Sequence, residues 1–142
     1  MSDNIKVMVR VRPFNQREIR EGSRTCNWIS DEIPNTIVLD PNPKPKCFTF
    51  DWTGGQKTTQ SEIFHFFGKQ MVDSVFQGYN STIFAYGQTG AGKTFTMLGK
   101  GICDEGNNIN SDNEDRGLQP RCIEYLFWKC QQDRERNNNN EH

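Results

Sequence analysis

The sequence predicts an α/β fold in which helices flank a central β-sheet, and three features predict it. Apolar residues alternate over Ile5–Val11, which is typical of a strand with one buried face. An amphipathic helix is expected over residues 59–78, and another helix is expected from Pro120. Between these helices, the apolar run Ser81–Tyr86 predicts a strand that leads into a glycine-rich loop. Because strands and helices alternate along the chain, the helices are expected to cover the sheet.

Two further strands and a short helix are expected in the first third of the chain. Asn15 is suited to cap the helix, Glu18 follows three residues later, and Gly22 can end it in a left-handed conformation. The short β-like runs are Thr36–Leu39 and Cys47–Phe50, and a proline-rich connector separates them.

The helix over residues 59–78 has clear signals at both ends. Thr59 and Glu62 fit the capping-box pattern, and Gly78 is placed to end the helix. An apolar stripe recurs at helical spacing, made of Ile63, Phe64, Phe67, Met71, Val75 and Phe76. The same spacing returns after Pro120, whereas the final RERNNNNEH is low in complexity and is not expected to fold.

Charge, hydropathy and cysteine content argue against several classes of protein. The formal net charge is −1, so no basic field for nucleic acid or for a membrane surface is expected. No stretch approaches the roughly 18 apolar residues of a membrane span. The N-terminus also lacks the apolar segment of a secretory signal. The five cysteines show no C-x-x-C spacing, so we expect reduced thiols and no zinc site.

A phosphate-binding loop is predicted where GQTGAGKT satisfies the pattern G-x-x-x-x-G-K-[ST] in full. Small residues let successive backbone N–H groups converge on a β-phosphate. A helix is expected to open at Gly92–Lys93 and to point its positive end at the same anion. Lys93 is expected to place its charge at the β- and γ-phosphates, and Thr94 to bind Mg²⁺ through its hydroxyl oxygen. These two residues are also the candidate catalytic residues. The predicted nucleotide-binding residues of the loop are Gly87, Gln88, Thr89, Gly90, Ala91, Gly92, Lys93 and Thr94.

Five segments, in their order and spacing, resemble the N-terminal part of a kinesin motor domain. They are IKVMVRVRPFN, FTFD, TTQSEIF, GYNSTIFAYGQTGAGKTFTM and RGLQPRCIEYLF. The resemblance covers about Ile5 to Glu135 and implies an incomplete kinesin motor domain of the P-loop NTPase type over residues 1–135. It also implies a surface loop inserted at residues 99–118, followed by the polar tail at 136–142. FTFD with TTQ, and EYLF, are most similar to the spindle-associated, plus-end-directed branch that includes the kinesin-12 group.

The resemblance assigns an adenine site to residues outside the phosphate-binding loop. Arg10, Arg12 and Pro13 match the family's R-x-R-P and would lie against adenine. Guanidinium planes and proline rings are suitable surfaces for a purine. Phe95, directly after the loop, would pack on the other face of the base. The alternative is that both arginines are simply solvated on the polar face of a strand.

The resemblance further implies ATP or ADP with Mg²⁺ as ligands, and ATP hydrolysis that drives movement along microtubules in the cytoplasm or the spindle. Kinesins sense the γ-phosphate with motifs resembling N-x-x-S-S-R-S-H and D-x-x-G-x-E, and neither follows Met97. The chain alone is therefore not expected to hydrolyse ATP. Segments that bind tubulin, and any coiled coil that forms oligomers, are expected outside these residues. A nucleotide-binding or interaction module without motor activity, or an unrelated P-loop kinase or GTPase, are the alternatives.

Two local features carry expectations of their own. Asp51–Gly54 mimics D-x-x-G, but this motif lies C-terminal to the P-loop in kinesins, so a γ-phosphate sensor is not expected here. The apolar faces of Ile5–Val11 and Ser81–Tyr86 are expected to lack partners in a partial domain, which would leave open sheet edges.

Overall fold

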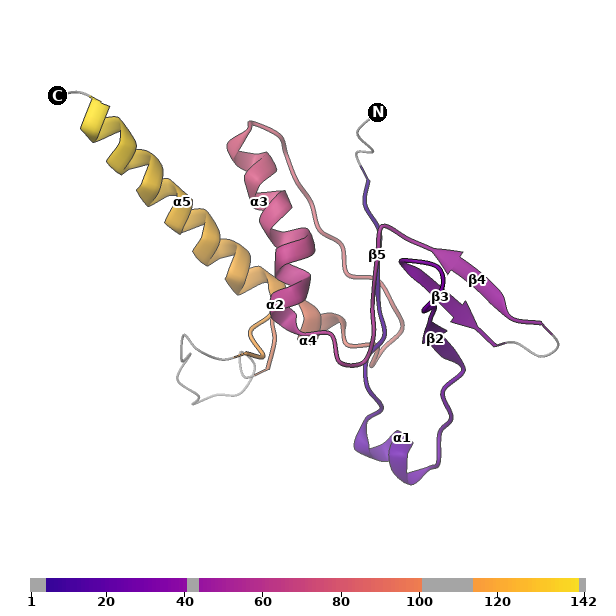
Figure 1. Cartoon of the computed structure of the whole chain (residues 1–142). Helices are drawn as coiled ribbons and strands as arrows, with labels where there is room; N and C mark the ends of the chain where they lie inside the picture. Colours follow the sequence, from indigo (N-terminus) through magenta and orange to yellow (C-terminus); the bar gives the residue numbers. More distant parts are fainter. Residues whose placement is uncertain (1–4, 41–43, 101–113, 141–142) are drawn as a thin grey trace. The chain divides into compact units, whose positions relative to one another are not determined.

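The computed structural model describes residues 5–40, 44–100 and 114–140 (Figure 1). The chain divides into two compact units, Met1–Thr58 and Thr59–His142. The described cysteines Cys26, Cys47, Cys122 and Cys130 are free thiols, as predicted, and Cys103 lies outside the described residues. Among the described residues, no helix combines the length and the apolar content needed to cross a membrane.

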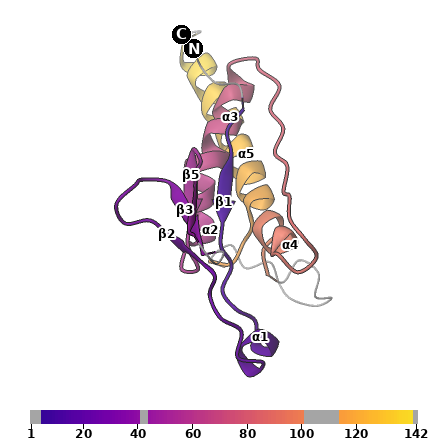
Figure 2. The same ribbon diagram turned by 90° about the vertical axis from the view of Figure 1, so that its right-hand side faces the viewer.

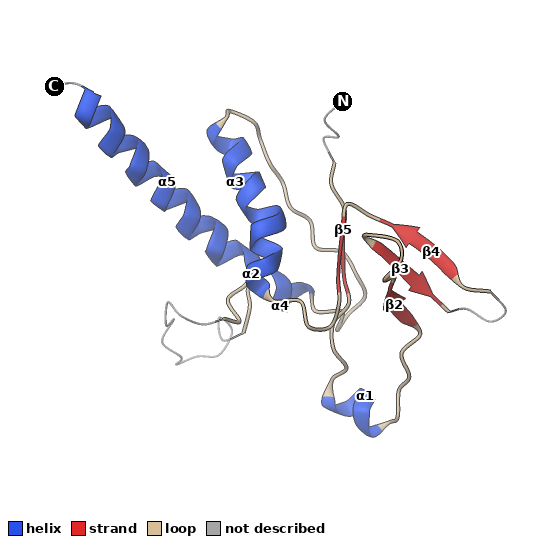
Figure 3. Ribbon diagram, in the orientation of Figure 1, coloured by secondary structure: helices blue, strands red, loops and turns tan. Residues whose placement is uncertain are grey.

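The first unit contains all the strands of the described residues (Figure 3). Its elements are β1 (Met8–Arg10), α1 (Gln16–Arg20), β2 (Asn27–Ile29), β3 (Thr36–Leu39), β4 (Lys46–Thr49) and β5 (Trp52–Gly54). β1 pairs in parallel with β5, with Met8 opposite Trp52. β2, β3 and β4 form an antiparallel sheet in that order.

The small core of the first unit lies on β3. Thr36, Ile37 and Val38 are buried. The hydroxyl groups of Thr36 and Thr49 share a hydrogen bond of 2.7 Å across β3 and β4, which satisfies two polar atoms at the edge of this core. The predicted strand Thr36–Leu39 is confirmed, and the one predicted at Cys47–Phe50 is shifted by one residue. β2 and β5 were not predicted, because three residues are too few to show a period.

Asp51, just before β5, forms two hydrogen bonds with the main chain just before β1. Its carboxylate accepts a hydrogen bond from the Val7 N–H at 2.7 Å, and its own N–H donates to the Val7 carbonyl at 3.1 Å. The Val11 N–H continues this pairing by donating to the Gly54 carbonyl at 2.8 Å. Asp51 therefore sets the register of a parallel strand pair, which gives the D-x-x-G mimic a structural purpose.

The second unit is helical in its described residues. Its elements are α2 (Gln60–Ile63), η1 (Phe64–Gly68), α3 (Lys69–Phe76), α4 (Lys93–Met97) and α5 (Leu118–Asn140). The predicted helix over residues 59–78 is one rod made of α2, η1 and α3, and η1 is a π-helical turn within it. Its capping box is confirmed: the Glu62 N–H donates to Thr59 Oγ1 at 3.2 Å, and the Glu62 carboxylate accepts from the Thr59 N–H at 2.7 Å.

Helix α5 packs across the rod near η1, and the two views agree on this crossing (Figure 1 and Figure 2). Ile63, Val72 and Leu118 are the buried apolar side chains of this unit's described core. The Phe64 and Tyr125 rings meet edge to face with their centroids 5.8 Å apart. Gly68 allows the close approach, because a Cβ there would lie 2.7 Å from Leu118 Cδ1.

The predicted strand Ser81–Tyr86 is wrong: the segment is irregular, and no described residue pairs with it in a ladder. Phe84 is 89% exposed and Tyr86 is fully exposed. A strand obtains its hydrogen bonds from neighbouring strands, so an apolar run without a neighbour gains little from the extended conformation. β1 is also shorter than the strand predicted over Ile5–Val11, although β5 pairs with it.

The expectation that the polar tail does not fold is also wrong for the residues that the structure describes. Helix α5 begins at Leu118, two residues before the predicted Pro120, and continues through the polar run to Asn140. Nucleation is the costly step of helix formation, and packing against the rod provides it, so exposed polar residues can extend the helix. The predicted loop at residues 99–118 falls mainly on residues 101–113, which lie outside the described residues.

Candidate functional site

The predicted phosphate-binding loop lies between the irregular segment after α3 and the start of α4. The Ala91 N–H donates to the Gln88 carbonyl at 3.1 Å and closes a turn within the loop. Gly90 and Gly92 have φ values of 80° and 89°, which residues with a Cβ rarely adopt. The helix predicted to open at Gly92–Lys93 is confirmed, since Gly92 is the N-cap of α4. α4 is only five residues long.

The Lys93 side chain forms hydrogen bonds that join the end of the loop to its beginning. Its ammonium donates to the carbonyl oxygens of Gly87 and Gln88, each at 2.8 Å. These two bonds hold the positive charge over the first two residues of the loop. An ammonium has three donors, so it can keep both carbonyl contacts and still donate to a phosphate oxygen. The residues of GQTGAGKT thus form a closed loop with an ammonium group at its mouth, and phosphate binding by this loop stays a prediction.

The donor set at this loop suits Mg²⁺ and not a transition metal. Within the described ranges, no group of three or more His, Cys, Asp and Glu is placed to hold a metal ion. Thr94 follows Lys93 in the first turn of α4 and is exposed. A hydroxyl is a hard oxygen ligand, and Mg²⁺ takes few protein ligands beside water and phosphate oxygens. The residues present therefore fit a magnesium ion carried by a nucleotide.

Phe95, which follows this loop, forms a hydrogen bond with the side chain of Gln60. This contact was not predicted from the sequence, and Gln60 was not assigned to the site. The Phe95 carbonyl accepts a hydrogen bond from Gln60 Nε2 at 2.6 Å and another from the Gly99 N–H at 2.9 Å. Gln60 was missed because it lies inside a capping box, where a polar residue in the first turn is ordinary. Neither periodicity nor motif signals its burial.

The predicted adenine residues divide between the two units: Arg10, Arg12 and Pro13 belong to the first, and Phe95 belongs to the second. Arg10 is on β1, and its guanidinium donates to the Thr58 carbonyl at 3.1 Å. Burial lowers the pKa of Arg10 from its ordinary value. The side chain is thus partly buried in its own unit and is not simply a solvated group on the polar face of a strand.

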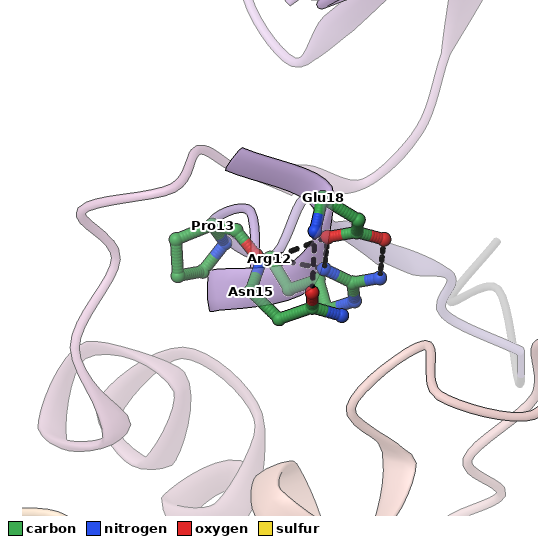
Figure 4. A network of polar contacts seen from close by, with 4 residues as sticks. All are labelled: Arg12, Pro13, Asn15 and Glu18. Carbon is green, nitrogen blue, oxygen red and sulfur yellow. Dashed lines mark hydrogen bonds and ion pairs between the residues drawn. The ribbon is translucent and has the colours of Figure 1, made fainter. Parts of the chain in front are cut away.

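Arg12 is held by the first turn of α1 (Figure 4). Its guanidinium donates to Glu18 through Nη1 at 2.7 Å and Nη2 at 2.5 Å, and Nη1 also reaches the Pro13 carbonyl at 2.8 Å. The same Glu18 carboxylate accepts the Asn15 N–H at 2.8 Å and completes the predicted capping box. Hydrogen bonds from Arg12 and the Asn15 backbone lower the pKa of Glu18 to about 2. The ion pair was not predicted from the sequence.

A comparison with known protein families finds a match over most of the chain. A family model described as the kinesin motor domain matches residues 10–141. This chain belongs to the kinesin family. The match includes the R-x-R-P residues that begin at Arg10, the last residue of β1, and it includes the glycine loop and α5. The recognition made from the motifs is therefore confirmed.

Individual relatives agree with the family. Over 134 residues, this chain is 44% identical to "Kinesin-like protein KIF15" of Strongylocentrotus purpuratus, covering 94% of this chain and 9% of the relative. "Kinesin heavy chain" of Botryotinia fuckeliana is 43% identical over 128 residues, covering 89% of this chain and 13% of the relative. The chain therefore spans only a small part of the length of these kinesins.

A solved structure supports the fold class. It is described as "Structure of a fast kinesin: Implications for ATPase mechanism and interactions with microtubules", and it is 41% identical to this chain with a TM-score of 0.74. The similarity covers 87% of this kinesin chain and 32% of that chain. The predicted α/β class, as part of a kinesin motor domain, is thereby confirmed.

Proposed function

We propose that this chain is the nucleotide-binding part of a microtubule motor and that residues 87–94 hold Mg·ATP or Mg·ADP. The observation that carries the proposal is the closed loop, in which Lys93 bonds to the carbonyls of Gly87 and Gln88. Positive charge and left-handed glycines at one short loop suit a polyphosphate and have no evident role in packing.

Each group of the loop has a distinct role in this proposal. The backbone N–H groups of Gln88, Thr89, Gly90 and Gly92 bind phosphate oxygens, whereas the Ala91 N–H keeps the turn closed through the Gln88 carbonyl. Lys93 stabilises the charge on the β- and γ-phosphates. Thr94 contributes its hydroxyl to Mg²⁺, which neutralises phosphate charge when the nucleotide is bound. Lys93 and Thr94 are the residues of this chain that we assign to ATP turnover in the complete protein.

The adenine residues belong to the same proposal, and each unit is considered by itself: the first supplies Arg10, Arg12 and Pro13 as candidate contacts for the base, and the second supplies Phe95. Two observations support it. Arg12 is oriented by its ion pair with Glu18, so its guanidinium plane is held before any base arrives. Phe95 is only partly exposed, and its main chain is held from two sides.

Movement along microtubules is the function of the whole protein that this family membership supports. The similar solved kinesin structure is described as bearing on an ATPase mechanism and on interactions with microtubules. We propose the same activity and partner for the longer protein, with the microtubule cytoskeleton, including the spindle, as its place of action. Tubulin binding, and any oligomer formed through a coiled coil, are assigned to segments beyond these residues.

Binding of a fluorescent ADP analogue with Mg²⁺ to the whole 142-residue chain tests the site. The K93A substitution removes one charged donor, worth about 1.5–3 kcal/mol, so Kd is expected to rise roughly 10- to 150-fold. K46A is the control, because Lys46 is an exposed lysine on β4 of the first unit and is no part of the loop. Equal affinity for K93A and K46A would overturn the proposed site.

The motor function is tested separately in the longer protein. K93A is expected to abolish microtubule-stimulated ATP turnover, because phosphate charge would lose its principal protein cation. Turnover at the normal rate in that variant would contradict the assignment, whatever the fluorescence measurement shows.

A further inference from the structure

Gln60, the first residue of α2, is a polar side chain buried inside the second unit. It is only 2% exposed. Its amide nitrogen donates to the Phe95 carbonyl at 2.6 Å and lies 3.5 Å from the Asp115 carbonyl. These partners lie 35 and 55 residues away along the chain. A buried amide that reaches two distant backbone carbonyls links three segments at one point.

The two carbonyls lie close to the stretches of main chain where the 99–118 insertion leaves and rejoins the helices. We use the word neck for the two paired stretches Leu98–Lys100 and Asp115–Gly117 at the base of the insertion, and not for the neck segment of a kinesin. The Lys100 N–H donates to the Asp115 carbonyl at 3.2 Å, and the Gly117 N–H donates to the Leu98 carbonyl at 3.1 Å. Gly99 and Arg116 form an isolated antiparallel bridge between the two stretches.

The neck is closed so tightly that both of its glycines are required. A Cβ on Gly99 would overlap the Asp115 carbonyl oxygen, and one on Gly117 would overlap the backbone at Leu98 and Gly99. The obstructing atoms are backbone, which has no room to move aside. The Gly99 N–H also donates to the Phe95 carbonyl at 2.9 Å, so the neck and Gln60 share one acceptor.

We propose that Gln60 is a positioning residue for the nucleotide site. It holds the Phe95 main chain against the neck, and so it sets the direction of the first turn after the phosphate-binding loop. The proposal rests on the proposed function, because Phe95 is assigned to the adenine there. Loss of the amide removes one donor from the Phe95 carbonyl and loosens the neck, and the nucleotide then dissociates faster.

A purely structural role would have a different signature. A buried glutamine that only satisfies two carbonyls stabilises the whole unit, and its loss resembles the loss of any core contact. V72A provides that reference, because Val72 is a buried apolar residue on α3 and has no part in the loop or the neck. Q60M is the test variant, since methionine keeps the length of the side chain and removes its donor.

Hydrogen exchange is measured on the 142-residue chain without nucleotide. In Q60M, the amides of Gly99, Lys100 and Gly117 are expected to exchange about fivefold faster than in V72A at matched overall stability. A fivefold increase in the exchange rate is the effect expected from the loss of one ordinary buried hydrogen bond. Equal exchange at these amides in the two variants overturns the proposal, and it does so whether or not the chain binds nucleotide.

The second measurement is the dissociation rate of a fluorescent ADP analogue with Mg²⁺. Q60M is expected to release it about fivefold faster than V72A. Faster neck exchange with an unchanged release rate would also overturn the positioning role. If the unmodified chain binds no nucleotide, the proposed function fails, while the exchange result still decides whether Gln60 holds the neck.

Discussion

Asp73 on α3 and Lys129 on α5 form an ion pair, with Asp73 Oδ1 2.6 Å from Lys129 Nζ. The same carboxylate accepts the Tyr125 hydroxyl at 2.9 Å and, through Oδ2, the Lys69 ammonium at 2.9 Å. Lys129 also lies over the Phe76 ring, 4.8 Å from its centroid. One carboxylate therefore joins the rod to α5 at the edge of their apolar contact.

Replacing Asp73 by Asn is expected to destabilise the second unit. The change keeps the size of the side chain and removes the charge that two ammonium groups face, at a cost of about 1 kcal/mol after solvent screening. Urea unfolding of D73N measures the loss, with D133N as the control because Asp133 is an exposed acid on α5. Equal stability of the two variants would show that the Asp73 pair contributes nothing measurable.

The contribution of Asp73 is also expected to depend on pH. Hydrogen bonds from Lys129, Lys69 and Tyr125 lower the pKa of Asp73 from 3.8 to about 2. Between these values the unfolded chain binds more protons, so the stabilisation is complete above about pH 4 and is lost as pH falls through 2. The difference in free energy of unfolding between wild type and D73N should therefore shrink from pH 6 to about pH 2. A constant difference would contradict the assigned cause.

Glu18 in α1 is expected to contribute more to the free energy of unfolding than Glu21, which caps the C-terminus of the same helix. Side chains of the Arg12–Glu18 pair are 29% and 27% exposed, whereas those of Arg17–Glu21 are 79% and 55% exposed. Exposed pairs are largely screened, so E21Q is expected to be nearly neutral and E18Q measurably destabilising. Urea unfolding of both variants makes the comparison, and a larger effect for E21Q would refute it.

Gly68 is expected to resist substitution although it lies in a helix. Alanine favours helices, but a Cβ at this position would lie 2.7 Å from Leu118 Cδ1 and 2.9 Å from Cys122 Sγ. Overpacking of this kind costs roughly 1–3 kcal/mol. Thermal unfolding of G68A measures the cost, and Q70A is the control on the exposed surface of α3. A stabilised G68A would show that α5 can move away without penalty.

The proposed nucleotide is ADP, so ADP is expected to bind more tightly than GDP. Stacking on an aromatic ring is worth about 1–3 kcal/mol for any base, so F95L should weaken ADP binding about 5- to 150-fold. Competition of ADP and GDP against a fluorescent ADP analogue, in wild type and F95L, measures both effects. A chain that prefers GDP would overturn the adenine site.

Features that depend on residues close together in the chain could be predicted from the sequence. The capping boxes at Asn15 and Thr59, the turn from Gly92 into α4 and the strand Thr36–Leu39 were all confirmed. Each depends on backbone geometry and hydrogen bonds within a few residues, which sequence spacing describes directly. The family was recognised for the same reason, because its phosphate-binding loop is one continuous segment.

Features that depend on distant partners were missed or wrong. The run Ser81–Tyr86 has the composition of a strand and forms none among the described residues, because a strand is decided by its neighbours. The ion pair between Arg12 and Glu18 was also missed although the two residues are only 6 positions apart, because it depends on the path of the turn between them.

The sequence by itself therefore determined the family and the local caps, and it located the glycine loop to which we assign the phosphates. Only the tertiary structure decided that Gln60 is buried against the Phe95 carbonyl and that Asp73 joins α3 to α5. The physical reason is that these contacts join residues 35 to 56 positions apart. At that separation no local spacing records them, and the packing of the second unit brings the groups together.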